Sequence, residues 1–122
     1  MKQTKGKLIK KRHLTKNWEK MFHKGITLVD FDAPWCAPCR VQKTIIDQLA
    51  GRYQGKARIL ELDVDTHRKV AMQLGITSIP TVVLFKDGEE MKRFVGIHPA
   101  EVLSMAIDKM LGKDKKQYQP DI

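Results

Sequence analysis

The order of apolar segments along the chain predicts an α/β protein with a mixed central sheet of about five strands, flanked by about four helices. Strand-like and helix-like patterns alternate through most of the sequence, which is typical of parallel crossover connections. Near the end, two strand-like runs meet at Asp87-Gly88, a dipeptide typical of antiparallel hairpins. With 122 residues and 42% hydrophobic content, the chain can form one domain with a single core.

The first strand-helix pair lies in the basic N-terminal part of the sequence. Residues 8–9 are a short strand candidate, and Thr15 can cap a helix that runs to about residue 24. Gly25 ends this helix. Three large apolar side chains share one face of it: Trp18, Met21 and Phe22.

A second strand-helix pair follows, and then a third strand. The apolar run 26–32 predicts a buried strand, and residues 36–53 show the apolar spacing of a helix that faces the core. The side chains at this spacing are Val41, Ile45, Ile46 and Leu49. Residues 57–64 predict the next strand.

The last part of the domain contains a short helix, a hairpin and a final helix. The short helix is expected over 66–74 and is stopped by Gly75. The hairpin strands are 81–85 and 90–95. The final amphipathic helix carries an apolar stripe of Val102, Leu103, Ala106, Met110 and Leu111.

Both cysteines lie in the segment Trp35-Cys36-Ala37-Pro38-Cys39-Arg40, between the strand 26–32 and the helix that follows it. A helix N-terminus favours a thiolate through its unpaired N–H groups and its partial positive charge, so we expect Cys36 to be the nucleophile. Cys39 lies about one turn further on and is the expected resolving thiol. Pro38 suits the helix start because it lacks an N–H group.

A Cys-x-x-Cys pair has two other common uses. A tetrahedral zinc site needs four ligands, and the histidines show no partner spacing, so zinc would require a dimer that supplies four sulfurs. A purely structural disulfide across so few residues removes little entropy from the unfolded chain. The sequence therefore favours redox chemistry, with no metal.

Further landmarks make the chain resemble the thioredoxin family over about residues 8–111. They are Val29-Asp30-Phe31, Ala33, the Trp35 to Cys39 segment, Ile79-Pro80-Thr81 and Lys86-Asp87-Gly88, in this order. The resemblance implies the thioredoxin fold. It also implies a protein dithiol/disulfide oxidoreductase that reduces substrate disulfides through Cys36 and Cys39.

The resemblance also implies a substrate-binding surface and a proton carrier. Pro80 is expected in the cis form beside the cysteines, with the backbone at Ile79 open to an extended substrate chain. The apolar patch expected around the Cys36 sulfur consists of Trp35, Ile79, Pro80, Gly96 and Ile97. Asp30 matches the buried aspartate that exchanges a proton with the resolving thiol, and burial should raise its pKa.

Other residues near the cysteines are expected to tune the redox couple. Asp32 stands where bacterial members usually carry an aromatic residue, and Glu61 stands where many members carry a lysine near the buried aspartate. Extra negative potential disfavours the thiolate, whereas Arg40 opposes this effect. The remaining tuning positions are within the pair itself, at Ala37 and Pro38.

The net charge of +9 is concentrated at the start of the chain, because residues 1–24 contain nine Lys or Arg against Glu19. A basic lead-in (1–7) can meet acidic proteins, nucleic acid or anionic lipid, but a solvated segment is the favoured interpretation. Without interleaved aromatic residues, we expect no specific nucleic-acid binding. After the domain at 8–111, residues 112–122 form a polar tail.

Composition also bounds compartment and partners. No apolar stretch approaches the roughly 20 residues of a membrane span, and the N-terminus lacks a secretory apolar segment, so we expect a cytoplasmic protein. We also expect it to be a monomer. The chain has no nucleotide motif and should need no cofactor of its own. By resemblance, its electrons come from a separate flavin-containing, NADPH-dependent thioredoxin reductase.

Two alternative functions remain open from the sequence. A thiol oxidase or disulfide isomerase of the same fold differs mainly in the residues between the cysteines and in their electrostatics. A redox-inert interaction module could instead dock through the basic N-terminal segment and the patch around Trp35. The intact Cys36 and Cys39 argue against this module.

Overall fold

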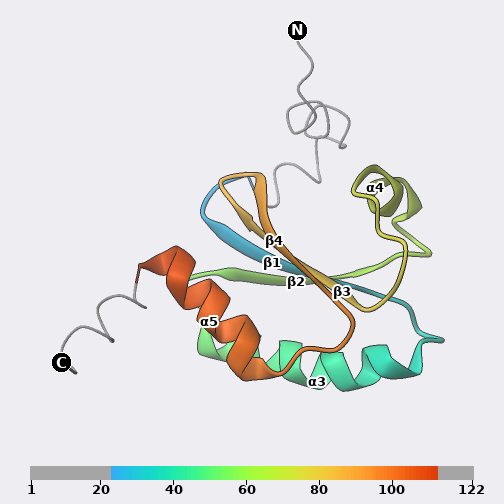
Figure 1. The fold of residues 1–122 in the computed structure, drawn as a ribbon, viewed down its shortest axis with the longest axis horizontal. Helices are drawn as coiled ribbons and strands as arrows, with labels where there is room; N and C mark the ends of the chain where they lie inside the picture. The colour runs from blue at the N-terminus through green and yellow to red at the C-terminus, as the bar shows by residue number, and fades with distance from the viewer. Residues whose placement is uncertain (1–22, 113–122) are drawn as a thin grey trace, which may run out of the picture.

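The computed structural model describes residues 23–112, which form four strands and three helices (Figure 1). In chain order they are β1 (Ile26–Asp32), α3 (Ala37–Arg52), β2 (Arg58–Asp63), α4 (Arg68–Gln73), β3 (Thr81–Lys86), β4 (Glu89–Val95) and α5 (Ala100–Leu111). The predicted mixed α/β fold is confirmed. The strand expected at 8–9 and residues 15–22 of the helix expected at 15–24 lie outside the described residues, and residues 23–24 are described and are not helical.

The four strands form one sheet in the order β2-β1-β3-β4. The outer strand β2 pairs in parallel with β1, whereas β1 with β3 and β3 with β4 are antiparallel. In the β1–β2 register, Asp30 lies opposite Glu61. This register places Asp30 and Glu61, two acids that were predicted to lie near the cysteines, on adjacent strands.

The sheet separates two apolar layers, with α3 and α5 on one face and α4 on the other (Figure 1). Successive side chains of a strand point to opposite faces, so Leu28 packs with the α3 and α5 layer while Val29 packs with the α4 layer. By the same alternation, Asp30 and Asp32 lie on the face that α3 covers. The helix that carries the cysteines therefore also covers these acids.

The prediction that Val41 lies on the core-facing side of α3 is wrong. Val41 is 54% exposed, whereas Gln42 is fully buried. The buried face of the helix follows Cys39, Gln42, Ile46 and Leu49, a spacing of three and four residues that leaves Val41 just outside the contact. Helix α5 departs in a smaller way, since Val102 is 38% exposed.

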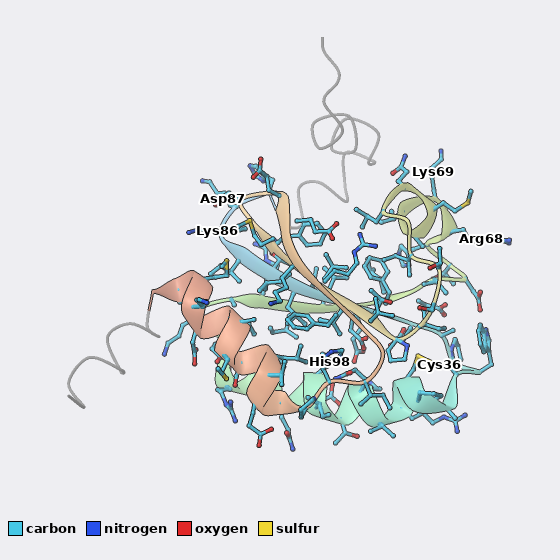
Figure 2. All side chains as sticks on the ribbon, in the orientation of Figure 1. Cys36, Arg68, Lys69, Lys86, Asp87 and His98 are labelled. Carbon is cyan, nitrogen blue, oxygen red and sulfur yellow. A yellow bond between two sulfur atoms is a disulfide. The ribbon has the colours of Figure 1, made fainter. Side chains whose placement is uncertain are left out.

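The hairpin closes at the end of the sheet that is remote from Cys36 (Figure 2). Asp87 and Gly88 both have positive φ angles, 50° and 86°, as a two-residue turn of the primed kind requires. The Asp87 carboxylate accepts a 2.8 Å hydrogen bond from the Gly25 N–H, which ties this turn to the start of β1. Within residues 23–112, no helix has the length and apolar content to cross a membrane.

Candidate active site

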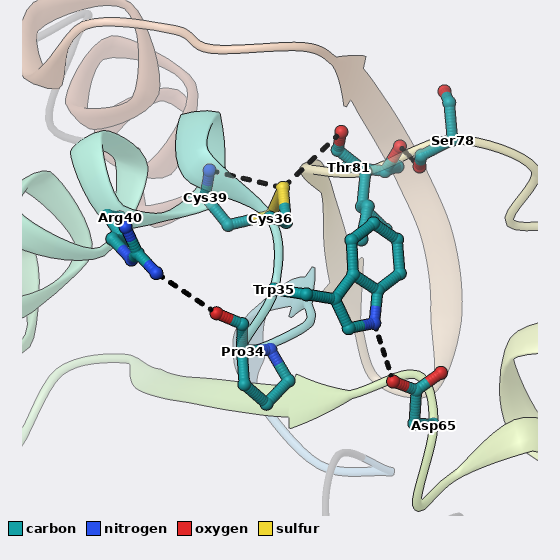
Figure 3. Close-up of a disulfide and its surroundings, with 9 residues drawn as sticks. Pro34, Trp35, Cys36, Cys39, Arg40, Asp65, Ser78 and Thr81 are labelled. Atoms are coloured by element: carbon teal, nitrogen blue, oxygen red, sulfur yellow. Dashed lines mark hydrogen bonds between the residues drawn. A yellow bond between two sulfur atoms is a disulfide. The ribbon is translucent and has the colours of Figure 1, made fainter.

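Strand β1 ends at Asp32, four residues before Cys36, and Cys36 is the N-cap of α3. Its backbone is extended (φ −94°, ψ 109°), and its Sγ atom accepts a 3.3 Å hydrogen bond from the Cys39 N–H group. Cys36 and Cys39 form a disulfide with their Cα atoms 5.3 Å apart (Figure 3). One N–H group of the first helical turn, that of Cys39, is thus directed at the Cys36 sulfur, an arrangement that favours negative charge on this sulfur.

The residues around the disulfide hold the helix start in place. Pro38 lies in the first turn of α3, where its missing N–H group costs no hydrogen bond. Arg40 is exposed and donates a 3.5 Å hydrogen bond to the Pro34 carbonyl (Figure 3). Its charge thus stays within the loop that precedes the cysteines.

The segment before β3 faces the sulfur of Cys36. The Ile79–Pro80 peptide bond is cis, as the resemblance implies, and the Ile79 carbonyl oxygen lies 4.0 Å from the Cys36 sulfur. The Gly96 N–H group donates a 2.8 Å hydrogen bond to the Pro80 carbonyl. Three segments distant in sequence, around Cys36, Ile79 and Gly96, therefore meet at this point.

Two apolar side chains of the predicted patch are open to solvent: Trp35 is 68% exposed and Ile97 is 45% exposed. The Trp35 indole donates a 2.8 Å hydrogen bond to the Asp65 carboxylate, which fixes the ring toward the loop between β2 and α4 (Figure 3). Sequence analysis did not identify Asp65, because the reach of an indole to another loop has no sequence pattern.

Asp30 is a fully buried acid on β1. Neither of its carboxylate oxygens has a hydrogen-bond partner among the described residues. Atoms of Asp30, Asp32 and Glu61 lie within 4.8 Å of one another. Burial, and next the negative charges of Asp32 and Glu61, raise the pKa of Asp30 to about 8, against the lowering effect of Lys43.

Asp32 belongs to the same group. Burial raises its pKa first, followed by the charges of Glu61 and Asp63, while Lys43 acts in the opposite direction. Close carboxylates resist simultaneous ionisation, so Asp30 and Asp32 titrate as coupled acids.

Lys43 is the cation of this acidic group, and sequence analysis missed it. Its Nζ atom lies 3.1 Å and 3.2 Å from the two carboxylate oxygens of Glu61 and 3.8 Å from Asp47. The pKa of Lys43 is raised, first by its hydrogen bond to Glu61 and then by the negative charge of Glu61. The available signal was its position four residues after Cys39, one turn along the helix that covers Asp30.

A pocket of about 270 Å³ lies between Cys39 and two of these acids, Asp32 and Glu61, whereas Asp30 is not among its lining residues. Its walls include Asp32, Cys39, Arg40, Lys43 and Glu61. A pocket of this size and polarity can admit water, which can carry a proton between a thiol and a buried acid.

The carboxylates of this group are the oxygen ligands that hard divalent cations take. In this structure Glu61 is paired instead with the Lys43 ammonium group, whose positive charge neutralises the carboxylate. The cysteines are joined in a disulfide, a state in which neither offers a thiolate to zinc.

A disulfide at a helix N-terminus, a cis-proline beside the first sulfur and an acid-lined pocket beside the second define a dithiol/disulfide oxidoreductase. The thioredoxin family model matches residues 10–109. The thioredoxin of Staphylococcus haemolyticus is 44% identical over 95 residues, which cover 78% of this chain and 91% of that protein. The thioredoxin of Staphylococcus aureus is 45% identical over 71% of this chain and 84% of its own length.

The similarity extends to solved structures. The X-ray structure of Fasciola hepatica thioredoxin has a TM-score of 0.70 and 33% sequence identity, covering 77% of this chain and 91% of that chain. The chain belongs to the thioredoxin family and is a thioredoxin-type disulfide reductase. Family membership implies protein disulfides as substrates and a reductase as partner.

Proposed function

We propose that this chain works as a cytoplasmic reductant of protein disulfides, with Cys36 as nucleophile, Cys39 as resolving thiol and Asp30 as proton carrier. The observation that carries the proposal is the different surroundings of the two sulfurs. The Cys36 sulfur faces the Ile79 carbonyl, whereas Cys39 lines the acidic pocket.

The first step is attack on the substrate. The Cys36 thiolate attacks one sulfur of the substrate disulfide, a mixed disulfide forms, and the other substrate sulfur leaves as a thiolate. The extended substrate chain lies against the patch formed by Trp35, Ile79, Pro80, Gly96 and Ile97. The Ile79 backbone offers the hydrogen-bonding groups with which the substrate backbone pairs.

The second step releases the substrate. Cys39 gives its proton through water to Asp30 in its ionised form, which is the minor form at neutral pH when the pKa is about 8. The resulting Cys39 thiolate attacks the Cys36 sulfur. The mixed disulfide breaks, the Cys36–Cys39 disulfide forms, and the substrate sulfur leaves as a thiolate. A pKa of about 8 for Asp30 is close to the ordinary pKa of a thiol, so the proton transfer is nearly balanced in free energy.

The reduction potential of the Cys36–Cys39 couple is tuned by the residues around it, which are Asp32, Glu61, Ala37, Pro38 and Arg40. Recycling needs two electrons and two protons from a donor, and a flavin-containing, NADPH-dependent thioredoxin reductase is the partner that fits. The cycle needs no second copy of the chain, so we propose that it acts as a monomer. A reducing cytoplasm is the compartment in which such a donor keeps the pair reduced.

The reduction potential of the Cys36–Cys39 couple tests the proposed direction. After equilibration in graded dithiothreitol and glutathione buffers, alkylation of the free thiols should give a value near or below about −260 mV. A value above about −180 mV would replace the reductant with a thiol oxidase or isomerase.

A trapping experiment tests the roles of the two sulfurs. Cys39→Ser should accumulate a mixed disulfide with an oxidised protein substrate, because the resolving thiol is missing. Cys36→Ser should accumulate none. Trapping by Cys36→Ser in place of Cys39→Ser would reverse the assignment.

A further inference from the structure

Gln42 is a polar side chain buried completely on α3, three residues after Cys39. Its amide makes two hydrogen bonds to one residue that is 56 positions away. The Gln42 Oε1 atom accepts from the His98 N–H at 2.8 Å, and its Nε2 donates to the His98 carbonyl at 3.0 Å. The side chain thus pairs with the His98 backbone as a neighbouring strand would.

The residue that Gln42 holds belongs to the loop between β4 and α5, which carries Gly96 and Ile97. Figure 2 shows His98 in this loop, above α3 and on the side of the molecule near Cys36. The His98 Nδ1 atom lies 3.0 Å from the Gly96 carbonyl oxygen, within hydrogen-bond distance of it. The His98 ring also makes an edge contact with Phe94, at 5.2 Å between centroids.

The loop therefore has two attachments that bear on the cysteines. The Gly96 N–H bonds to the carbonyl of Pro80, the residue after Ile79, whose own carbonyl faces the Cys36 sulfur. Gln42 bonds the loop to the helix that carries both cysteines. The second attachment fixes how far Gly96 and Ile97 stand from Cys36. Loss of Gln42 would leave two backbone groups of a half-buried residue without partners, and the loop would move toward water to satisfy them.

We propose that Gln42 is a positioning residue that fixes the 96–98 loop for extended protein substrates, so that it sets the preference for protein disulfides over small ones. The inference rests on the proposed function, because it assumes that the substrate chain contacts this loop. A small disulfide needs only access to the Cys36 sulfur and is insensitive to the loop. A protein chain needs the loop and the Ile79 edge at a fixed spacing.

The test compares two substrates with the reduced protein: insulin as a protein disulfide and cystamine as a small one. Rates of oxidation are followed by quenching with an alkylating agent. Gln42→Met keeps a similar length and removes both hydrogen bonds, so we expect the rate with insulin to fall about tenfold while the rate with cystamine stays within about twofold. Gln48→Met, an exposed change on the same helix, is the matched control and should leave both rates unchanged.

A second variant separates positioning from general loosening of the fold. When the new carboxyl group of Gln42→Glu is ionised, it accepts a hydrogen bond from the His98 N–H but cannot donate one to the His98 carbonyl. When the carboxyl group is protonated, it can make both hydrogen bonds. The ratio of the insulin rate to the cystamine rate cancels the ionisation of Cys36. We expect this ratio to be low at pH 8 and to recover as the pH is lowered toward 5.

The outcomes distinguish this inference from the proposed function. If the wild type reduces neither disulfide, the proposed function fails. If the wild type reduces both and Gln42→Met lowers both rates equally, or lowers neither, the positioning role is overturned. If Gln42→Met does not fold, a pH-independent rate ratio in Gln42→Glu overturns the role in the same way.

Discussion

At the scale of single residues, the acidic group behind Cys39 depends on a balance between two charges that belong to different elements. Glu61 on β2 raises the pKa of Asp30, and Lys43 on α3 lowers it. The two side chains are also hydrogen-bonded to each other, so each partly cancels the effect of the other. Changing either one alone should therefore shift Asp30 in a predictable direction.

Lys43→Met and Glu61→Gln should shift the pKa of Asp30 in opposite directions. Without Lys43, the Glu61 charge is no longer neutralised and the pKa of Asp30 rises by up to about one unit; without Glu61, it falls by a similar amount. The measurement is a carbon NMR titration of the Asp30 carboxyl group. Shifts in the same direction would contradict the assignment of Lys43 as the compensating cation.

Two further variants calibrate this result. Asp47→Asn removes the more distant partner of Lys43, at 3.8 Å, and should leave the Asp30 titration almost unchanged. Glu61→Lys reverses the charge beside Asp30 and should lower its pKa further than Glu61→Gln. The pH dependence of disulfide reduction should shift in parallel; an unchanged profile would show that Glu61 does not act on the proton transfer.

The sequence places some residues of this site well and others not at all. Strand alternation predicts that Asp30 and Asp32 share a face, and the structure confirms it. Lys43 and Gln42 make their contacts across elements, to Glu61 and His98. Such contacts depend on how α3 sits over the sheet, and periodicity along one element carries no such information.

At the scale of elements, the four strands and the helices α3 and α4 lie within two residues of their predicted bounds, whereas for α5 only an apolar stripe was predicted. The largest differences are at α4, where the helix expected from Thr66 begins at Arg68. The N–H groups of Thr66 and His67 bond to the Asp63 carbonyl, at 3.2 Å and 2.9 Å. These residues therefore form a turn first, which an apolar pattern cannot distinguish from a first helical turn.

Helix α4 is fastened to the sheet by a side chain of β4. The Arg93 guanidinium donates a 2.7 Å hydrogen bond to the carbonyl of Leu74, the C-cap residue of α4, and a 3.4 Å bond to that of Gly75. Glu90 holds the guanidinium with two 2.7 Å hydrogen bonds. A cation at a helix C-terminus also interacts favourably with the helix dipole.

Arg93→Met should destabilise the protein by about 1–3 kcal/mol, because the charged hydrogen bonds to the end of α4 are lost. Denaturant unfolding at pH 7 gives the free energy of unfolding, and hydrogen exchange should show faster opening in α4 than in α3. Lys69→Met, an exposed change on α4 itself, serves as the control and should stay within about 0.5 kcal/mol of the wild type. Equal losses in the two variants would show that Arg93 does not fasten α4.

At the scale of the whole molecule, the raised pKa of Asp30 is a consequence of the complete fold. The sheet, α3 and the neighbouring acids all have to be in place to keep a proton on Asp30 at neutral pH. In the unfolded chain the same carboxyl group returns to an ordinary pKa of about 3.9. Between these two values the folded protein binds more protons than the unfolded chain.

This difference makes the free energy of unfolding depend on pH with a definite sign. Since the folded state holds the extra proton, stability falls as the pH rises from about 4 to about 8 and levels off above the folded pKa. In Asp30→Asn this contribution is absent. The variant should therefore gain stability relative to the wild type through this range, by on the order of a few kcal/mol at pH 8.

Denaturant unfolding of the oxidised wild type and of oxidised Asp30→Asn at several pH values between 4 and 9 measures the difference directly. Subtracting the two curves removes the contributions of the other titrating groups, provided that they are unchanged. The difference should be small near pH 4, should grow with pH and should reach a plateau above about pH 8. Parallel curves would mean that Asp30 titrates alike in both states, and the fold would then not raise the pKa of Asp30 toward that of a thiol.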